Sequence, residues 1–122
     1  MKVMDVIQHL QDVKPFDYYA NDFPHSAGNC AFVRFNEGGA PNAYLLELAN
    51  PNLQIAVRHK RGSEAERISY DIFDYLNGKF HFEMGDTYVY SMLAQQSEPI
   101  YVGTDDNGRT IYSLNIACKV RR

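Results

Sequence analysis

The sequence lacks a long apolar run and an excess of charge of either sign. Its apolar runs are only a few residues long, too short to span a membrane, and Asp5, Gln8 and His9 interrupt the stretch where a signal peptide needs apolar residues. We therefore expect the protein to stay in the cytoplasm of the cell that makes it. Lys and Arg number 12 and Asp and Glu 15, a net charge of −3. Because the only basic blocks are residues 58–61 and the pair Arg121-Arg122, no sequence-specific nucleic-acid binding is expected.

Tryptophan is absent and cysteine is scarce. Cys30 and Cys118 both lie in strand-like runs, which favours two small buried side chains. A disulfide between them remains the alternative, disfavoured by a reducing cytoplasm. The length of 122 residues suits a single domain over residues 1–122, which can bury enough surface to fold without a metal or a disulfide.

Two segments have helical periodicity. In residues 1–13, Val3, Val6, Ile7 and Leu10 recur at helical spacing, and Pro15 follows, so a short helix is expected. The second helix is expected from Ser63 to Gly78.

Both ends of this second helix carry signals. Ser63 and Glu66 have the spacing of a capping box, and Gly78 suits the left-handed position after a helix end. The apolar stripe between them comprises Ala65, Ile68, Ile72, Tyr75 and Leu76.

The remaining periodic segments predict strands. Their expected ranges are 30–36, 43–49, 53–60, 80–83, 87–95, 100–103 and 109–120, with turns at 38–41, 50–52, 85–86 and 105–108. Alternation places Tyr88, Tyr90 and Met92 on one face of their strand. Residues 15–29 form a long connection that contains four aromatic side chains.

This order of elements predicts an α+β fold, an antiparallel or mixed sheet with two amphipathic helices packed on one face. Several strands carry a second row that is partly apolar, including Phe32. Such a row needs a cover, which is either the aromatic connection or another subunit.

Candidate chemistry in the sequence is weak. A metal site of a small hydrolase could be drawn from His59, His81 and Glu83, but nothing in the spacing requires these residues to converge. Cys30 with His25 could form a thiol nucleophile, yet a Cys within an apolar strand is usually inert. No catalytic residue, metal or cofactor is therefore expected.

Aromatic residues are abundant in comparison. The chain has nine tyrosines and seven phenylalanines, spread over loops and both strand faces. Such a surplus is typical of a surface that docks on another protein, although core packing could absorb many of these rings.

An ordered set of short motifs resembles the tail terminator proteins of long-tailed bacteriophages, often labelled minor capsid proteins. The set spans nearly the whole chain and comprises Asp22-Phe23-Pro24, Gly38-Gly39, Gln54-Ile55-Ala56-Val57-Arg58, Ala65-Glu66-Arg67, Leu76-Asn77-Gly78, Glu98-Pro99-Ile100, Asp105-Asp106-Asn107-Gly108-Arg109 and Tyr112-Ser113-Leu114-Asn115. The resemblance implies a small α+β subunit without catalysis. Such a subunit forms a ring, usually a hexamer, on the head-proximal end of the tail tube, stops its polymerisation and joins the tail to the head in the virion.

This role implies three partners: other copies of the chain, the major tail tube protein, and a head-completion or connector protein. From expected exposure and charge we place subunit or partner contacts at eight residues: Arg58, Lys60, Arg61, Tyr88, Tyr90, Asp105, Asp106 and Arg109. The alternatives are a head-completion protein on the portal side and, from another class, the metal-dependent hydrolase.

Overall fold

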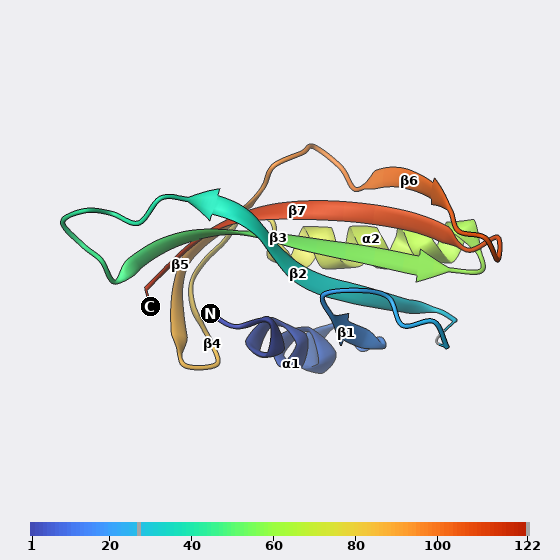
Figure 1. The fold of residues 1–122 in the computed structure, drawn as a ribbon, viewed down its shortest axis with the longest axis horizontal. Coiled ribbons are helices and arrows are strands. Elements are labelled where there is room, and N and C mark those ends of the chain that lie inside the picture. The colour runs from blue at the N-terminus through green and yellow to red at the C-terminus, as the bar shows by residue number, and fades with distance from the viewer. Residues whose placement is uncertain (27, 122) are drawn as a thin grey trace.

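The computed structural model describes residues 1–26 and 28–121 (Figure 1). Arg122 of the terminal basic pair therefore lies outside the described residues. The elements in chain order are α1 (Val3–Val13), β1 (Tyr18–Ala20), β2 (Cys30–Gly39), β3 (Leu48–His59), α2 (Gly62–Leu76), β4 (Lys79–Met84), β5 (Thr87–Ala94), β6 (Ile100–Thr104) and β7 (Thr110–Arg121). Their order confirms the predicted α+β class.

The described strands form one mixed sheet in the order β1-β2-β3-β7-β5-β4, with β6 also paired to β7. The β1–β2 pair is parallel and the other pairs are antiparallel. Strand β7 is long enough to pair with β3 on one side and with two strands on the other. Its first half pairs with β6 and its second half with β5.

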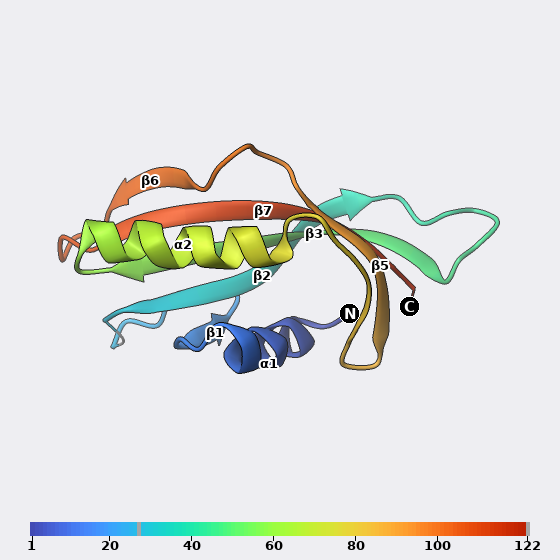
Figure 2. The ribbon, with the colours of Figure 1, turned by 180° about the vertical axis from the view of Figure 1, so that it is seen from behind.

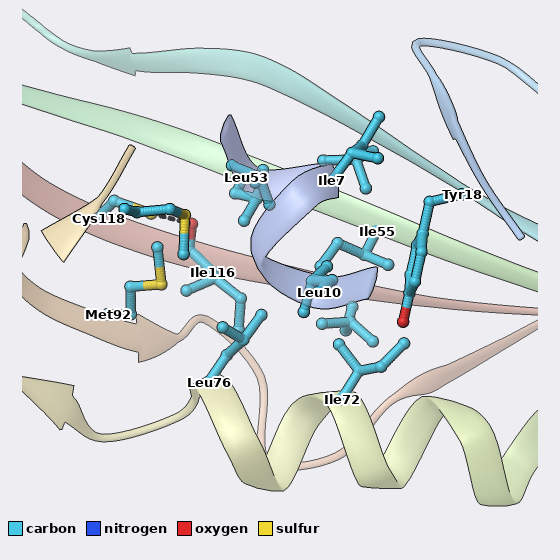
Figure 3. Packing of buried hydrophobic residues seen from close by; sticks show 14 of the residues in the cluster. Ile7, Leu10, Tyr18, Leu53, Ile55, Ile72, Leu76, Met92, Ile116 and Cys118 are labelled. Carbon is cyan, nitrogen blue, oxygen red and sulfur yellow. Dashed lines mark hydrogen bonds between the residues drawn. The ribbon is translucent and has the colours of Figure 1, made fainter. Parts of the chain in front are cut away.

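Both helices lie on the same face of the sheet, as predicted, and enclose a single core (Figure 2). Helix α1 contributes Val6, Ile7 and Leu10, and α2 contributes Ile72 and Leu76, all almost inaccessible to solvent. Figure 3 shows four of these side chains packed among Leu53, Ile55 and Ile116 of the central strands, namely Ile7, Leu10, Ile72 and Leu76. Each such side chain stabilises the fold by about 1.5–3 kcal/mol relative to an exposed one.

The capping box predicted at Ser63 and Glu66 is wrong. Helix α2 begins at Gly62, so Arg61 is the N-cap residue and no side chain caps the helix. The Arg61 amide instead donates to His59 Nδ1 at 3.0 Å. Glu66 is left to accept a hydrogen bond from the Tyr112 hydroxyl at 3.0 Å. At the other end Gly78 has a φ of 80°, which confirms its left-handed position.

The strand predicted at residues 43–49 and the turn at 50–52 are also wrong. Strand β3 runs without a break from Leu48 to His59, and residues 40–47 form the loop before it. Pro51 is accommodated because the register between β2 and β3 shifts nearby. In the pairing with β7, Ala49 and Asn52 have partners, whereas the two residues between them do not. A proline lacks the N–H that regular pairing requires, so it occurs where the ladder is irregular.

A β-bulge overturns the predicted face of Met92. The register between β5 and β7 shifts between Val89 and Ser91, so Val89 opposite Val120 and Met92 opposite Cys118 both lie in the core. An extra residue in one strand reverses the side on which all later side chains lie. Tyr88 and Tyr90 stay together on the other face, with ring centroids 5.0 Å apart.

The connection predicted at residues 15–29 contains a strand that the sequence did not reveal. Strand β1 has three residues and extends the sheet beside β2. Tyr18 is buried, and its hydroxyl donates to the Lys14 carbonyl at 2.5 Å. The connection is therefore packed on the sheet by its aromatic residues, as expected, and also by backbone pairing.

A side chain bridges the interval between the two strands that share one edge of β7. The side-chain nitrogen of Gln96, Nε2, donates to the Ser113 carbonyl at 3.1 Å. Its side-chain oxygen, Oε1, accepts from the backbone amide of Asn115 at 3.2 Å. Gln96 thus satisfies the backbone groups of β7 that neither β6 nor β5 reaches.

Candidate assembly interface

An ionic network lies at the corner where β3 ends and the β6–β7 hairpin turns. Asp105 Oδ2 accepts a hydrogen bond from Arg109 Nε at 2.7 Å and lies 3.8 Å from Arg58 Nη1. Arg58 also donates to the Pro24 carbonyl at 3.1 Å and to the Gly28 carbonyl at 3.3 Å. The two arginines therefore connect three segments that are distant in the sequence.

Asp105 also shapes the hairpin turn. Its Oδ1 accepts from the amides of Asn107 at 3.0 Å and Arg109 at 2.9 Å, and Gly108 has a φ of 75°. Partial burial alone would raise the pKa of Asp105, but the hydrogen bonds from Arg109 and Asn107 outweigh it and hold the pKa below its ordinary value. The predicted hairpin and its glycine are confirmed.

The aromatic connection covers the open face of the sheet at this corner. Phe23 packs edge-on against Phe32 of β2, with ring centroids 4.7 Å apart. The Arg58 guanidinium lies over the Phe23 ring, 4.5 Å from its centroid. Phe32 is buried as a result, so at this position the cover that the sequence required is the chain's own connection.

The structure separates the eight predicted contact residues into three groups. Arg58 and Arg109 are buried and Asp105 is half-buried, so the premise of exposure was wrong for the network. Tyr88 and Tyr90 are half-buried and contact His81. Exposed at the corner are Lys60, Arg61 and Asp106. An arginine in an alternating strand resembles a surface residue, and only the fold of the distant connection buries Arg58.

The candidate metal ligands form no site in the described part of the chain. No group of three His, Cys, Asp or Glu side chains there could hold a metal ion. His59, at the end of β3, accepts a hydrogen bond from the Arg61 amide. His81, in β4, forms a hydrogen bond with the Tyr88 hydroxyl at 3.0 Å. Partial burial lowers the pKa of His59, which favours the neutral ring that accepts this hydrogen bond.

The cysteines are free thiols in the structure, so it does not contain the alternative disulfide. Burial raises the pKa of Cys30, even though the nearby Arg58 and Arg109 act in the opposite direction. A nucleophile requires a thiolate. This site therefore disfavours the thiol chemistry considered for Cys30 and His25.

The structure has two exposed apolar surfaces that the sequence did not reveal. The first is the loop of residues 40–47, here called the arm, where Tyr44 is 95% exposed and Leu45 and Leu46 are also exposed. The second is the edge strand β6, with Ile100, Tyr101 and Val102 exposed. The signal was visible at residues 43–46, but the apolar run suggested a strand with one buried face.

The family comparison matches almost the whole chain. The model of the bacteriophage tail terminator protein family covers residues 5–122. The chain belongs to this family. Comparison with curated proteins gives no match.

As a member of the tail terminator family, the protein is a structural component of the phage tail. Among the described residues, no helix combines the length and the hydropathy needed to cross a membrane. Because the family is a structural family of the phage tail, the exposed arm and edge strand are candidate contact surfaces.

Proposed function

We propose that this protein caps the tail tube as a hexameric ring at the head–tail junction, stops polymerisation of the tube and joins the tail to the head. The observation that carries the proposal is the pair of exposed apolar surfaces, the arm and strand β6, on a chain of the tail terminator family. Exposed contiguous apolar surfaces mark sites of protein association. No residue is assigned a catalytic role.

A ring is built from heterologous contacts, in which each subunit offers one surface and receives another. Strand β6 is an edge of the sheet, and unpaired backbone groups at an edge favour pairing with another chain. Exposed Lys60, Arg61 and Asp106 at the corner supply charges for contacts with a neighbouring copy or with the head-completion or connector protein. Tyr88 and Tyr90 are proposed to face the major tail tube protein or a neighbouring copy.

Deletion of the gene in the phage or prophage, followed by electron microscopy of lysates, tests the proposal. We expect tails of uncontrolled length beside heads that are not joined to tails. Tails of normal length beside unjoined heads would instead identify a head-completion protein. Normal virions would refute both functions.

Light scattering after size-exclusion chromatography tests ring formation by the purified chain. A ring in solution would support the proposal directly. A chain that stays monomeric in solution and also fails to appear as a ring on isolated tails would refute the ring.

A further inference from the structure

The arm has a preformed tip with apolar side chains that project into solvent. Asn42 Oδ1 accepts hydrogen bonds from the amides of Tyr44 at 2.8 Å and Leu45 at 3.0 Å. The Leu48 amide donates to the Leu45 carbonyl at 3.0 Å and closes the turn. Tyr44 and Leu46 are 95% and 66% exposed, so the tip presents apolar surface that its own chain does not bury.

A cleft of about 400 Å³ lies between the end of α1 and the first half of α2. Its apolar lining includes Phe16 and Ile68, and its charged lining includes Lys14, Arg67 and Asp71. Its volume falls in the range of about 300–1,000 Å³ in which proteins enclose bound groups. The cleft can therefore accept large apolar side chains.

The charges on the arm and in the cleft are complementary. Arg67 is already paired, at 2.9 Å with Glu64 and at 3.0 Å with Asp71. Among the side chains that the structure describes, Lys14 has no ion pair with a carboxylate and Glu47, which follows the arm's apolar tip, has none with a cation. The cleft thus contains two carboxylates, which share Arg67, and a lysine, Lys14, that has no ion pair of its own within residues 1–26 and 28–121 and can accept a further carboxylate such as Glu47.

The arm and the cleft lie toward opposite ends of the molecule. In Figure 2, the loop between β2 and β3 projects beyond the sheet at one end, whereas the end of α1 and the start of α2 lie toward the other end; Figure 1 shows the same loop from the opposite side. A protruding surface and a receiving surface at opposite ends produce head-to-tail contacts rather than a two-fold dimer. The occupant that fits this cleft is therefore the arm of a second copy.

We propose that the arm of each subunit inserts Tyr44 and Leu46 into the cleft of the next subunit, with Glu47 beside Lys14. This contact rests on the proposed ring and identifies the surfaces that close it. Burial of the arm's apolar tip supplies the attraction, and the charge pair sets the register.

A charge exchange tests the contact by complementation of the gene deletion. Lys14→Glu and Glu47→Lys should each lower the phage titre by at least about tenfold, because each places like charges together. The double variant Lys14→Glu/Glu47→Lys should restore the titre to near that of the unchanged chain. The matched control pairs Glu47→Lys with Lys119→Glu, an exposed lysine outside the cleft, and should not restore it.

Cross-linking tests the direction of the contact. A chain with Tyr44→Cys and Ile68→Cys, oxidised in the lysate, should give a ladder of covalent multimers larger than dimers. A chain with only Tyr44→Cys or only Ile68→Cys should give no covalent multimers. This result would also show that the native Cys30 and Cys118 do not cross-link. Covalent dimers without larger species would overturn the head-to-tail arrangement.

The outcomes separate this contact from the proposed function. Normal virions after gene deletion would refute the function itself. If deletion abolishes joined particles while Lys14→Glu and Glu47→Lys each complement fully, the function stands and the arm–cleft contact is refuted. Thermal unfolding of each purified variant must match the unchanged chain, since all five substituted positions are at the surface or only partly buried.

Discussion

Replacement of Arg58 by alanine should destabilise the fold far more than replacement of a surface arginine with better ion pairs. Arg58→Ala removes two hydrogen bonds to backbone carbonyls, at 3.1 and 3.3 Å, and a guanidinium 4.5 Å from the Phe23 ring centroid. At about 1.5 kcal/mol per hydrogen bond from a charged donor and about 1 kcal/mol for the ring contact, the gross loss is about 4 kcal/mol. Water can reach the freed carbonyls in part, so we expect a net loss of about 3 kcal/mol in the free energy of unfolding.

Arg67→Ala is the matched control. Arg67 forms two ion pairs shorter than the 3.8 Å contact of Arg58, but its side chain is 57% exposed, so solvent screens both. For a chain of this size, a loss of about 3 kcal/mol corresponds to a fall of about 10 °C in the thermal midpoint. Circular dichroism at pH 7 should show this fall for Arg58→Ala and almost none for Arg67→Ala. Similar midpoints for the two variants would refute the argument that burial, rather than ion-pair geometry, determines the contribution of Arg58.

Three further predictions concern the core and the turns. Burial raises the pKa of Cys118 to about 12 from 9.0, so the unfolded chain releases this proton first. The contribution of Cys118 to stability should therefore be constant below about pH 9 and fall between about pH 9 and 12. Urea unfolding at pH 8 and 10 should show a smaller decrease for Cys118→Ala, and an equal decrease would contradict the assignment. A Cβ on Gly38 would lie 2.2 Å from the Asn50 carbonyl oxygen, whereas one on Gly28 would meet no atom within 4 Å. Gly38→Ala should therefore lower the thermal midpoint and Gly28→Ala should not. A lower midpoint for Gly28→Ala than for Gly38→Ala would disprove the close approach. Leu114, which is fully buried, should cost about 2–5 kcal/mol when replaced by alanine, and a loss below about 1 kcal/mol in urea titration would show that its site collapses.

Signals that act within a few residues were sufficient to predict much of the fold. The helical spacing of Val6, Ile7 and Leu10 predicted α1 and its buried face. Gly108 and Asp105 predicted the last hairpin, because a left-handed residue and an acceptor for free amides define such a turn locally. Each of these features depends on residues that are neighbours along the chain.

Features that depend on distant segments could not be predicted. The burial of Arg58 requires the connection to pack back over β2, and the position of Met92 depends on a single extra residue at the bulge. In the sequence alone, Pro51 indicated a turn. It is accommodated within a strand by a register shift against β2, and such a shift is a property of the paired strands that the residue alone does not reveal. The cleft that receives the arm in our proposal is likewise formed by distant segments together: residues 14–16 after α1, strands β1 and β3, and α2.

The bridging role of Gln96 has a mechanical consequence for the sheet. Strands β5 and β6 are both bonded to β7 and are not bonded to each other, and in the interval between them Gln95 and Gln96 form hydrogen bonds with β7. A change in the tilt of β6 therefore acts on the first half of β7 through their shared ladder, but no continuous ladder carries it from β6 to β5. The exposed edge can adjust its angle to a contacting molecule while the half of β7 above the core keeps its shape.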